Sequence, residues 1–209
     1  MIETRIISVD VLDIDLEVIG QIVDVLRKDK VIVYPTDTFY GLGANYFSVP
    51  AKQRVYSLKK RDSVKPLSAV VSDWDMLEGL DVEIPPVCMT LAGEFWPGPL
   101  TIVLPVRKTR HRGREDSLAV RVPDHAWLRS LVRKAGFPVT ASSANISGEK
   151  ESADPAEVID VFKGKVDMIV DGGLTRGGLP STILDLSRGR PEILREGAVP
   201  KEKLIPHLS

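Results

Sequence analysis

Two patterns of apolar residues alternate along this chain: a helical spacing of three or four residues, and short continuous runs typical of strands. Leu16, Ile19 and Val23 have the helical spacing, which predicts an amphipathic helix. Asp13 and Asp15 precede it and are candidate caps. The same reasoning predicts further helices after Ser48, Asp73, Pro86, Asp124 and Asp154, and a last helical turn or two from Lys201.

Short apolar runs between these helices predict strands. They lie at residues 31–34, 67–71, 100–104, 118–122, 137–141, 168–170, 182–186 and 192–194. Because strands and helices alternate, the predicted fold is α/β (α+β mixed), a three-layer domain with helices on both faces of the sheet. Consecutive strands near the end indicate a mixed sheet. At 209 residues, one well-cored domain is expected over residues 1–209.

Composition and charge narrow the class of ligand. Hydrophobic residues make up 43% of the chain and charged residues 27%, and the net charge is −1, which is ordinary for a globular protein. Residues 52–65 and 107–114 are rich in Lys and Arg, which favours a phosphate-bearing ligand or RNA over bulk membrane. The polar segment 106–116 is expected to be a mobile loop.

Other classes of protein are disfavoured. Cys88 is the single cysteine, so neither an intrachain disulfide nor a cysteine metal site is expected. No apolar run approaches the roughly 18 residues that cross a bilayer. The N-terminal residues do not form a secretory signal. The expectation is therefore a soluble, cytoplasmic protein.

Two short polar motifs carry the strongest candidate chemistry. Lys59 and Arg61 are two cations separated by one residue, and Ser143 and Asn145 are a hydroxyl and an amide with the same spacing. In extended backbone this spacing points both side chains of a pair to one side. Together they predict a receptor for a polyphosphate. Each pair also has a plain structural reading, as a solvated helix end or as turn and cap residues.

A second polar group follows the strand predicted at 31–34. Thr36, Asp37 and Thr38 come directly after its carboxyl end, and ligands of open α/β sheets bind outside such ends. The threonines can hold a small substrate or can simply satisfy backbone groups. Gly41 and Gly43, like Gly148, are expected to let backbone approach a ligand closely.

The common nucleotide signatures are absent. Residues 41–46 fail the G-x-G-x-x-G pattern at its last position, and no G-x-x-x-x-G-K-[ST] loop occurs. The three histidines are dispersed, which disfavours a histidine general base. Chemistry on a phosphate would therefore depend on positioning and charge neutralisation.

Two arginines close predicted strands. Arg121 lies in the apolar run 118–122, where a guanidinium is costly unless an anion pairs with it. Asp124 is the one acid near it in the sequence. Arg195 follows the strand at 192–194 in the same way. We therefore expect an anionic substrate as the partner of Arg121.

With these residues laid out, the chain resembles the YrdC family of threonylcarbamoyl-AMP synthases over about residues 10–200. Seven motifs carry the resemblance in order: P-T-[DE]-T-x-Y-G-L at 35–42, K-x-R…P-L at 59–67, W-P-G-P-L-T at 96–101, A-V-R-x-P at 119–123, S-x-N-x-S-G at 143–148, S-T-I at 181–183 and L-R-x-G at 194–197. The resemblance implies a twisted, open mixed sheet with a concave, positively charged groove.

The resemblance also implies a reaction. Members join L-threonine, bicarbonate and ATP into threonylcarbamoyl-adenylate and release pyrophosphate, with Mg²⁺ on the phosphates and no organic cofactor. A downstream transferase complex then passes the threonylcarbamoyl group to tRNA. Members have also been considered double-stranded-RNA binders.

Carried over residue by residue, the resemblance assigns a role to each candidate. Thr36, Arg121 and Ser181 would bind threonine, with Arg121 on its carboxylate. Lys59, Arg61, Ser143 and Asn145 would be catalytic and would hold the ATP phosphates and the carbamate that attacks them. Ser117, Ser152 and Arg195 would help to place the nucleotide. No protein side chain is assigned to a metal.

Three departures from the family pattern qualify the resemblance. Asp62 and Glu196 each stand where a proline is common, and no additional C-terminal domain is expected after Ser209. Two alternatives to the synthase stay open. One is a module that grips tRNA or double-stranded RNA without chemistry. The other is a paralogue that handles a carbamoyl group without threonine.

Overall fold

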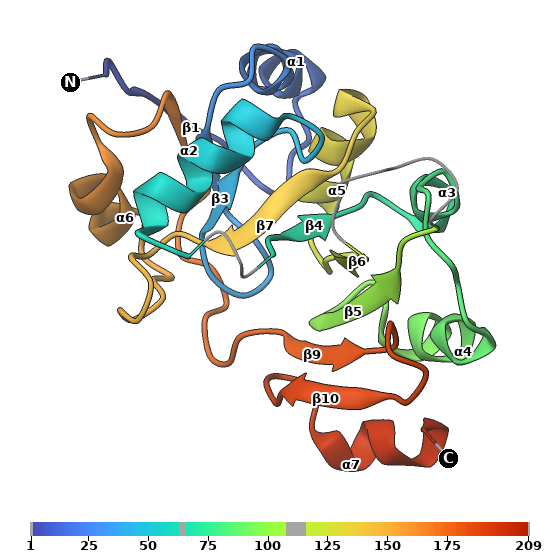
Figure 1. Cartoon of the computed structure of the whole chain (residues 1–209). Helices are drawn as coiled ribbons and strands as arrows, with labels where there is room; N and C mark the ends of the chain where they lie inside the picture. The colour runs from blue at the N-terminus through green and yellow to red at the C-terminus, as the bar shows by residue number, and fades with distance from the viewer. Residues whose placement is uncertain (1, 63–65, 108–115, 209) are drawn as a thin grey trace.

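A computed structural model describes residues 2–62, 66–107 and 116–208. Its described strands form one mixed sheet in the order β1-β8-β2-β3-β7-β4-β6-β5-β9-β10 (Figure 1). The strands are β1 (Arg5–Ser8), β2 (Ile32–Tyr34), β3 (Gly41–Gly43), β4 (Ser68–Val70), β5 (Leu100–Pro105), β6 (Ser117–Arg121), β7 (Val139–Ser143), β8 (Met168–Asp171), β9 (Thr182–Asp185) and β10 (Glu192–Arg195). Four neighbouring pairs are parallel and five are antiparallel, so the mixed sheet predicted from the sequence is confirmed.

The helices begin close to where the sequence predicts. They are α1 (Leu16–Arg27), α2 (Val49–Lys59), α3 (Trp74–Glu78), α4 (Pro86–Phe95), α5 (Ala126–Ala135), α6 (Pro155–Phe162), α7 (Lys201–Leu204) and the short 3₁₀ helix η1 (Ile205–His207). The Asp15 carboxylate caps α1 by accepting from the amides of Glu17 and Val18. The prediction that Asp124 caps α5 is wrong. His125 is the cap, and its Nδ1 accepts from the Leu128 amide at 3.2 Å.

The two faces of the sheet pack against different helices. Along β2, Ile32 and Tyr34 face α1 and α5, whereas the flanking Val31 and Val33 belong to the core under the other helices. That second core is larger and takes in buried residues of α2, α3, α4, α6 and α7. The three-layer arrangement predicted from the alternation of elements is therefore confirmed (Figure 1).

Glycines of β3 make room for an aromatic ring. A Cβ on Gly43 would lie 2.7 Å from ring carbons of Tyr34, and one on Gly41 would lie 3.1 Å from Tyr34 Cζ. The Tyr34 hydroxyl donates to the Thr140 carbonyl at 2.8 Å, so the ring is fixed in place. Gly41 also lines the cavity described below, so the close approach of a ligand stays a prediction there, whereas Gly43 is not part of that lining. Gly148 instead takes a left-handed φ of 91°, as a turn requires.

No helix among the described residues is long and apolar enough to span a membrane. The predicted mobile loop at 106–116 lies largely outside the described residues, and so do Arg110, Arg112 and Arg114 of the second basic stretch.

Candidate functional site

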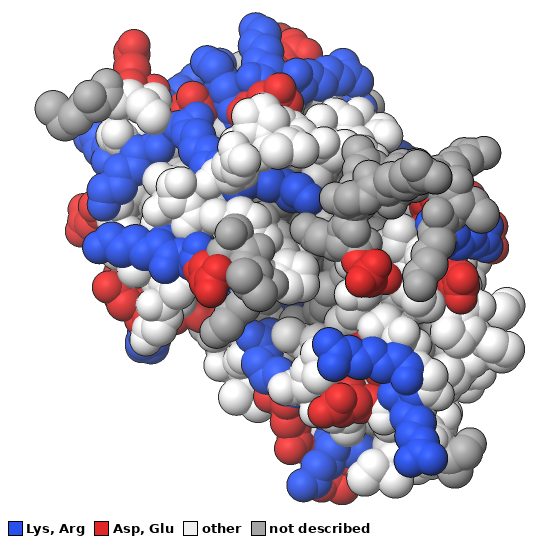
Figure 2. Space-filling view, in the orientation of Figure 1, with Lys and Arg blue, Asp and Glu red and all other residues white. Residues whose placement is uncertain are grey.

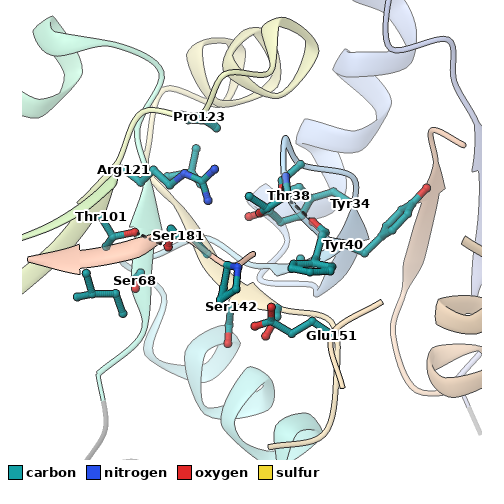
Figure 3. Close-up of a pocket in the computed structure, with 18 of the residues that line it drawn as sticks. Tyr34, Thr38, Tyr40, Ser68, Thr101, Arg121, Pro123, Ser142, Glu151 and Ser181 are labelled. Carbon is teal, nitrogen blue, oxygen red and sulfur yellow. Dashed lines mark hydrogen bonds between the residues drawn. The ribbon is translucent and has the colours of Figure 1, made fainter. Parts of the chain in front are cut away.

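A cavity of about 170 Å³ lies where β2, β6 and β7 end. Six of the ten site residues predicted from the sequence line it: Thr36, Arg61, Arg121, Ser143, Ser181 and Arg195. Figure 3 shows side chains from separate strands converging on this hollow, with Arg121, Thr38 and Ser181 on its walls. The remaining four, Lys59, Asn145, Ser117 and Ser152, do not line the cavity.

Lys59 lies behind the cavity and holds the loop that follows β7. It is the last residue of α2 and is 2% exposed, so it is not the solvated helix end that a cation there usually forms. Its Nζ donates to the Ser143 carbonyl at 2.5 Å, to the Asn145 carbonyl at 3.0 Å and to Asn145 Oδ1 at 2.8 Å. An ammonium group has three donors, and all three are used here.

Asn145 passes this support on to Ser143. Its Oδ1 accepts from Ser143 Oγ at 2.8 Å, and its Nδ2 donates to the Glu149 carbonyl at 2.6 Å. The Lys59 carbonyl in turn accepts from the Ser147 amide. Lys59 and Asn145 therefore act as one buried network, and Ser143 is the member that reaches the cavity.

The environment of Lys59 weakens its hold on its proton. Its pKa is lowered to about 8, because burial removes water from the ammonium and Arg61 adds a like charge. Glu151 acts in the opposite direction and raises the pKa. Deprotonation leaves only two donors, so the three hydrogen bonds to the loop cannot all persist well above pH 8.

Thr36 forms part of a tight polar turn after β2. Its Oγ1 donates to the Phe39 carbonyl at 2.7 Å and accepts from the Thr38 amide at 3.1 Å. Thr36 therefore satisfies backbone groups of the turn, and it also lines the cavity. The turn fixes the direction of the following residues, Asp37 and Thr38.

Arg121 has a protein partner that the sequence analysis did not find. Asp37 Oδ1 lies 2.6 Å from Arg121 Nη2, and both side chains are buried. Arg121 Nε donates to the Gly98 carbonyl at 2.9 Å. Asp124, the one acid near Arg121 in the sequence, is not this partner, because its Oδ2 lies 3.0 Å from Arg176 Nη1. The separation of 84 residues between Asp37 and Arg121 hides this pair from local reasoning.

Ser181 and Arg195 form another wall. The Ser181 and Thr101 hydroxyls share a hydrogen bond of 2.9 Å. Arg195 donates through Nε and Nη2 to the Ser181 carbonyl, at 3.1 and 2.8 Å. Burial lowers the pKa of Arg195, which nonetheless stays a cation. A hydroxyl pair beside a fixed guanidinium can recognise a small polar group.

Two predicted nucleotide-binding residues are placed elsewhere. Ser117 begins β6, whose opposite end carries Arg121. The Ser152 hydroxyl donates to Glu157 Oε2 at 2.5 Å and accepts from the Asp154 amide, so it organises the start of α6. Its neighbour Glu151 lines the cavity instead (Figure 3).

Sequence reasoning missed Thr101 and Glu151, which line the cavity, and it named Asp37 only as part of the polar group after residues 31–34, without its pairing to Arg121. Asp37 and Thr101 lie inside motifs quoted above, and their polar side chains beside apolar strands were the available signal. Glu151 sits in a polar segment with no periodicity, so nothing local distinguished it from Glu149.

The cavity combines two recognition chemistries. Arg121, Ser181 and Thr101 offer a guanidinium and hydroxyls, which suit a carboxylate and a small polar side chain. Arg61, Arg195 and Ser143 offer cations and a hydroxyl, which suit phosphate oxygens. The arrangement can bring an anionic small molecule next to a polyphosphate.

A family model described as "Telomere recombination" and named for Sua5, YciO and YrdC matches residues 24–197. The chain belongs to this Sua5/YciO/YrdC family, which confirms the resemblance found in its motifs.

Two curated relatives are threonylcarbamoyl-AMP synthases. The one from Pyrococcus abyssi is 40% identical over 182 residues, covering 86% of this chain and 54% of the relative. The one from Bacillus subtilis is 37% identical over 190 residues, covering 89% and 55%. The chain thus spans about half the length of these relatives. A crystal structure of P. abyssi Sua5 complexed with L-threonine is 38% identical, with a TM-score of 0.90, over 99% of this chain and 61% of that one.

Proposed function

We propose that this chain carries the active site of a threonylcarbamoyl-AMP synthase, which uses L-threonine, bicarbonate and ATP and serves threonylcarbamoyladenosine modification of tRNA. The observation that supports this most is the single cavity in which Arg121 and Ser181 lie with Arg61, Ser143 and Arg195. The names of the two curated relatives and the threonine complex of P. abyssi Sua5 point to the same reaction.

In the proposed reaction, the amine of threonine and bicarbonate form a carbamate and release water. A carbamate oxygen then attacks the α-phosphorus of ATP, and pyrophosphate leaves. Arg121 would hold the threonine carboxylate beside Ser181 and Thr36, while Arg61 and Arg195 would neutralise phosphate charge. Lys59 and Asn145 would act by keeping Ser143 in position.

A magnesium ion would enter with the phosphates of ATP. The described residues contain no group of three or more His, Cys, Asp or Glu that would hold a metal alone. Mg²⁺ usually takes one or two carboxylates plus substrate phosphates, and Glu151 is a carboxylate that lines this cavity. The ion would neutralise charge on the leaving pyrophosphate.

The direct test is pyrophosphate release by the purified chain with ATP, Mg²⁺ and bicarbonate. Release should require L-threonine. Ser143→Ala should reduce it about 100-fold, the scale for removing a group that positions or stabilises a transferring phosphoryl. Ser57→Ala, on the exposed face of α2, is the matched control and should have no effect. Release without regard to threonine would favour the carbamoyl paralogue instead.

Measuring RNA affinity beside pyrophosphate release distinguishes the RNA-binding alternative from the proposed enzyme. Figure 2 shows that the described Lys and Arg residues are interspersed with Asp and Glu on the viewed face. Ser143→Ala with Asn145→Ala removes no charge, so it should abolish turnover and leave any RNA affinity intact. If these variants weakened RNA binding equally, the cavity would be an RNA site.

The pH dependence of turnover should report Lys59. Activity is expected to fall as pH rises through about 8, because Lys59 then loses the proton that its three hydrogen bonds need. Glu151→Gln should move this basic limb to lower pH, since the carboxylate that raises the pKa of Lys59 is removed. Glu149→Gln is the matched control. An unchanged limb in Glu151→Gln would refute this assignment.

A further inference from the structure

The carboxylate of Asp37 lies behind Arg121, outside the cavity lining. The residue is 7% exposed, and its two carboxylate oxygens contact different groups. Oδ1 faces Arg121 Nη2 at 2.6 Å, and Oδ2 accepts from the Asp124 amide at 3.0 Å. The Asp124 amide therefore fixes the Asp37 carboxylate, which in turn is the ion-pair partner of Arg121.

The guanidinium of Arg121 is fixed on two sides. Nε donates to the Gly98 carbonyl, and the Asp37 carboxylate lies 2.6 Å from Nη2 as an ion-pair partner, so the group is held by a hydrogen bond on one side and by charge on the other. Figure 3 shows the guanidinium pointing into the cavity toward Thr38. We propose that Asp37 is a positioning residue that orients Arg121 for a carboxylate ligand and makes the site selective for zwitterionic amino acids. This inference rests on the proposed function, and it deepens it.

Charge explains the selectivity. Asp37 balances the charge of Arg121, so a ligand carboxylate that joins this pair brings a negative charge that Arg121 no longer compensates by itself; the other charged groups on the cavity lining are Arg61, Arg195 and Glu151. A ligand with its own ammonium group one carbon away supplies the missing positive charge. A simple acid of the same shape does not, and it also meets the repulsion of Asp37. The pair therefore favours an amino acid over its deaminated analogue.

The contact between Asp37 and Arg121 is mainly electrostatic. Among the described residues, neither Asp37 Oδ1 nor Arg121 Nη2 has a partner in good hydrogen-bond geometry, although the atoms are in ion-pair contact. Neutralising Asp37 should therefore change the charge at the ligand more than it changes the local fold. The Oδ2 contact to the Asp124 amide can persist in asparagine.

The test is calorimetric titration of the full chain with L-threonine and with (R)-3-hydroxybutyrate, which is threonine without its amino group. Asp37→Asn should weaken threonine binding by about tenfold or more, the scale for removing a group that orients a binding residue. It should weaken hydroxybutyrate less, so that the preference for threonine shrinks. Asp37→Glu keeps the charge and should retain the preference. Asp124→Asn, which alters an exposed carboxylate, should change neither.

The outcomes distinguish the positioning role of Asp37 from the proposed function of the chain. If wild type binds threonine and Asp37→Asn weakens both ligands equally, or neither, the positioning role is wrong while the proposed function stands. If wild type binds no threonine, the proposed function fails and this inference fails with it. Thermal melts confirm that each variant folds. Should Asp37→Asn not fold, Asp37→Glu carries the test, and loss of the preference in that variant would overturn the proposal.

Discussion

Replacing Arg121 by methionine is expected to destabilise the protein by about 3–5 kcal/mol and to abolish tight threonine binding. The stability loss follows from Asp37, which would keep its charge in a buried place without a cation. The affinity loss should be about 2–4 kcal/mol, because a charge-assisted pair at a desolvated site disappears. Urea unfolding and calorimetric titration measure the two effects separately.

Two controls give this prediction its force. Arg176→Met removes an exposed arginine from an exposed ion pair, so it should cost no more than about 1 kcal/mol. The double variant Asp37→Leu with Arg121→Met removes both buried charges and should recover much of the stability, without recovering threonine binding. A single Arg121→Met variant that is as stable as wild type and binds threonine normally would contradict both roles.

Lys59→Met is expected to reduce pyrophosphate release at least about 100-fold, the scale on which small misplacements of catalytic groups act. The change removes the donor of three hydrogen bonds to the Ser143 and Asn145 segment. Asn145 Oδ1 still accepts from Ser143 Oγ and the Ser143 carbonyl from the Asn145 amide, whereas the Asn145 carbonyl loses the lysine. An unsatisfied buried acceptor costs about 1–3 kcal/mol, so the segment should shift or open. Hydrogen exchange at residues 143–149 should rise in parallel with the loss of activity.

The adjacent lysine is the matched control for this variant. Lys60 is exposed and caps α2 with a left-handed φ of 49°. Lys60→Met removes the same charge from the next position, so it should leave both turnover and exchange near wild type. If the two variants behaved alike, Lys59 would contribute only to the general positive field.

The architecture could be predicted from the sequence because its signals are local. Apolar spacing identified the buried stripe of α1, and the apolar run at 31–34 predicted a buried strand, whose two faces both pack into cores. The cap of α5 was missed because Asp124 and His125 are adjacent and both side chains can accept a hydrogen bond. The boundary moved by one residue, which local propensity does not resolve.

The site was predictable only in part, since its partners are far apart in the chain. The motifs located Ser143, Arg121 and Ser181, but they gave no distance between them. The Asp37–Arg121 pair depends on how the β2 turn packs against the end of β6, and the burial of Lys59 depends on the loop after β7. These are properties of the assembled sheet, so no local window contains them.

The order of the strands in the sheet determines when each strand can find its neighbour during translation. β1 and β2 both pair in parallel with β8, which lies more than 130 residues further on. A ribosome therefore releases β1 and the apolar β2 long before their shared neighbour exists. Long-range pairing is slow because the entropy cost of closing the loop comes before the favourable free energy of the strand contacts. The first third of the nascent chain thus presents an open strand edge for most of translation, and we expect chaperones that act at the ribosome to bind there.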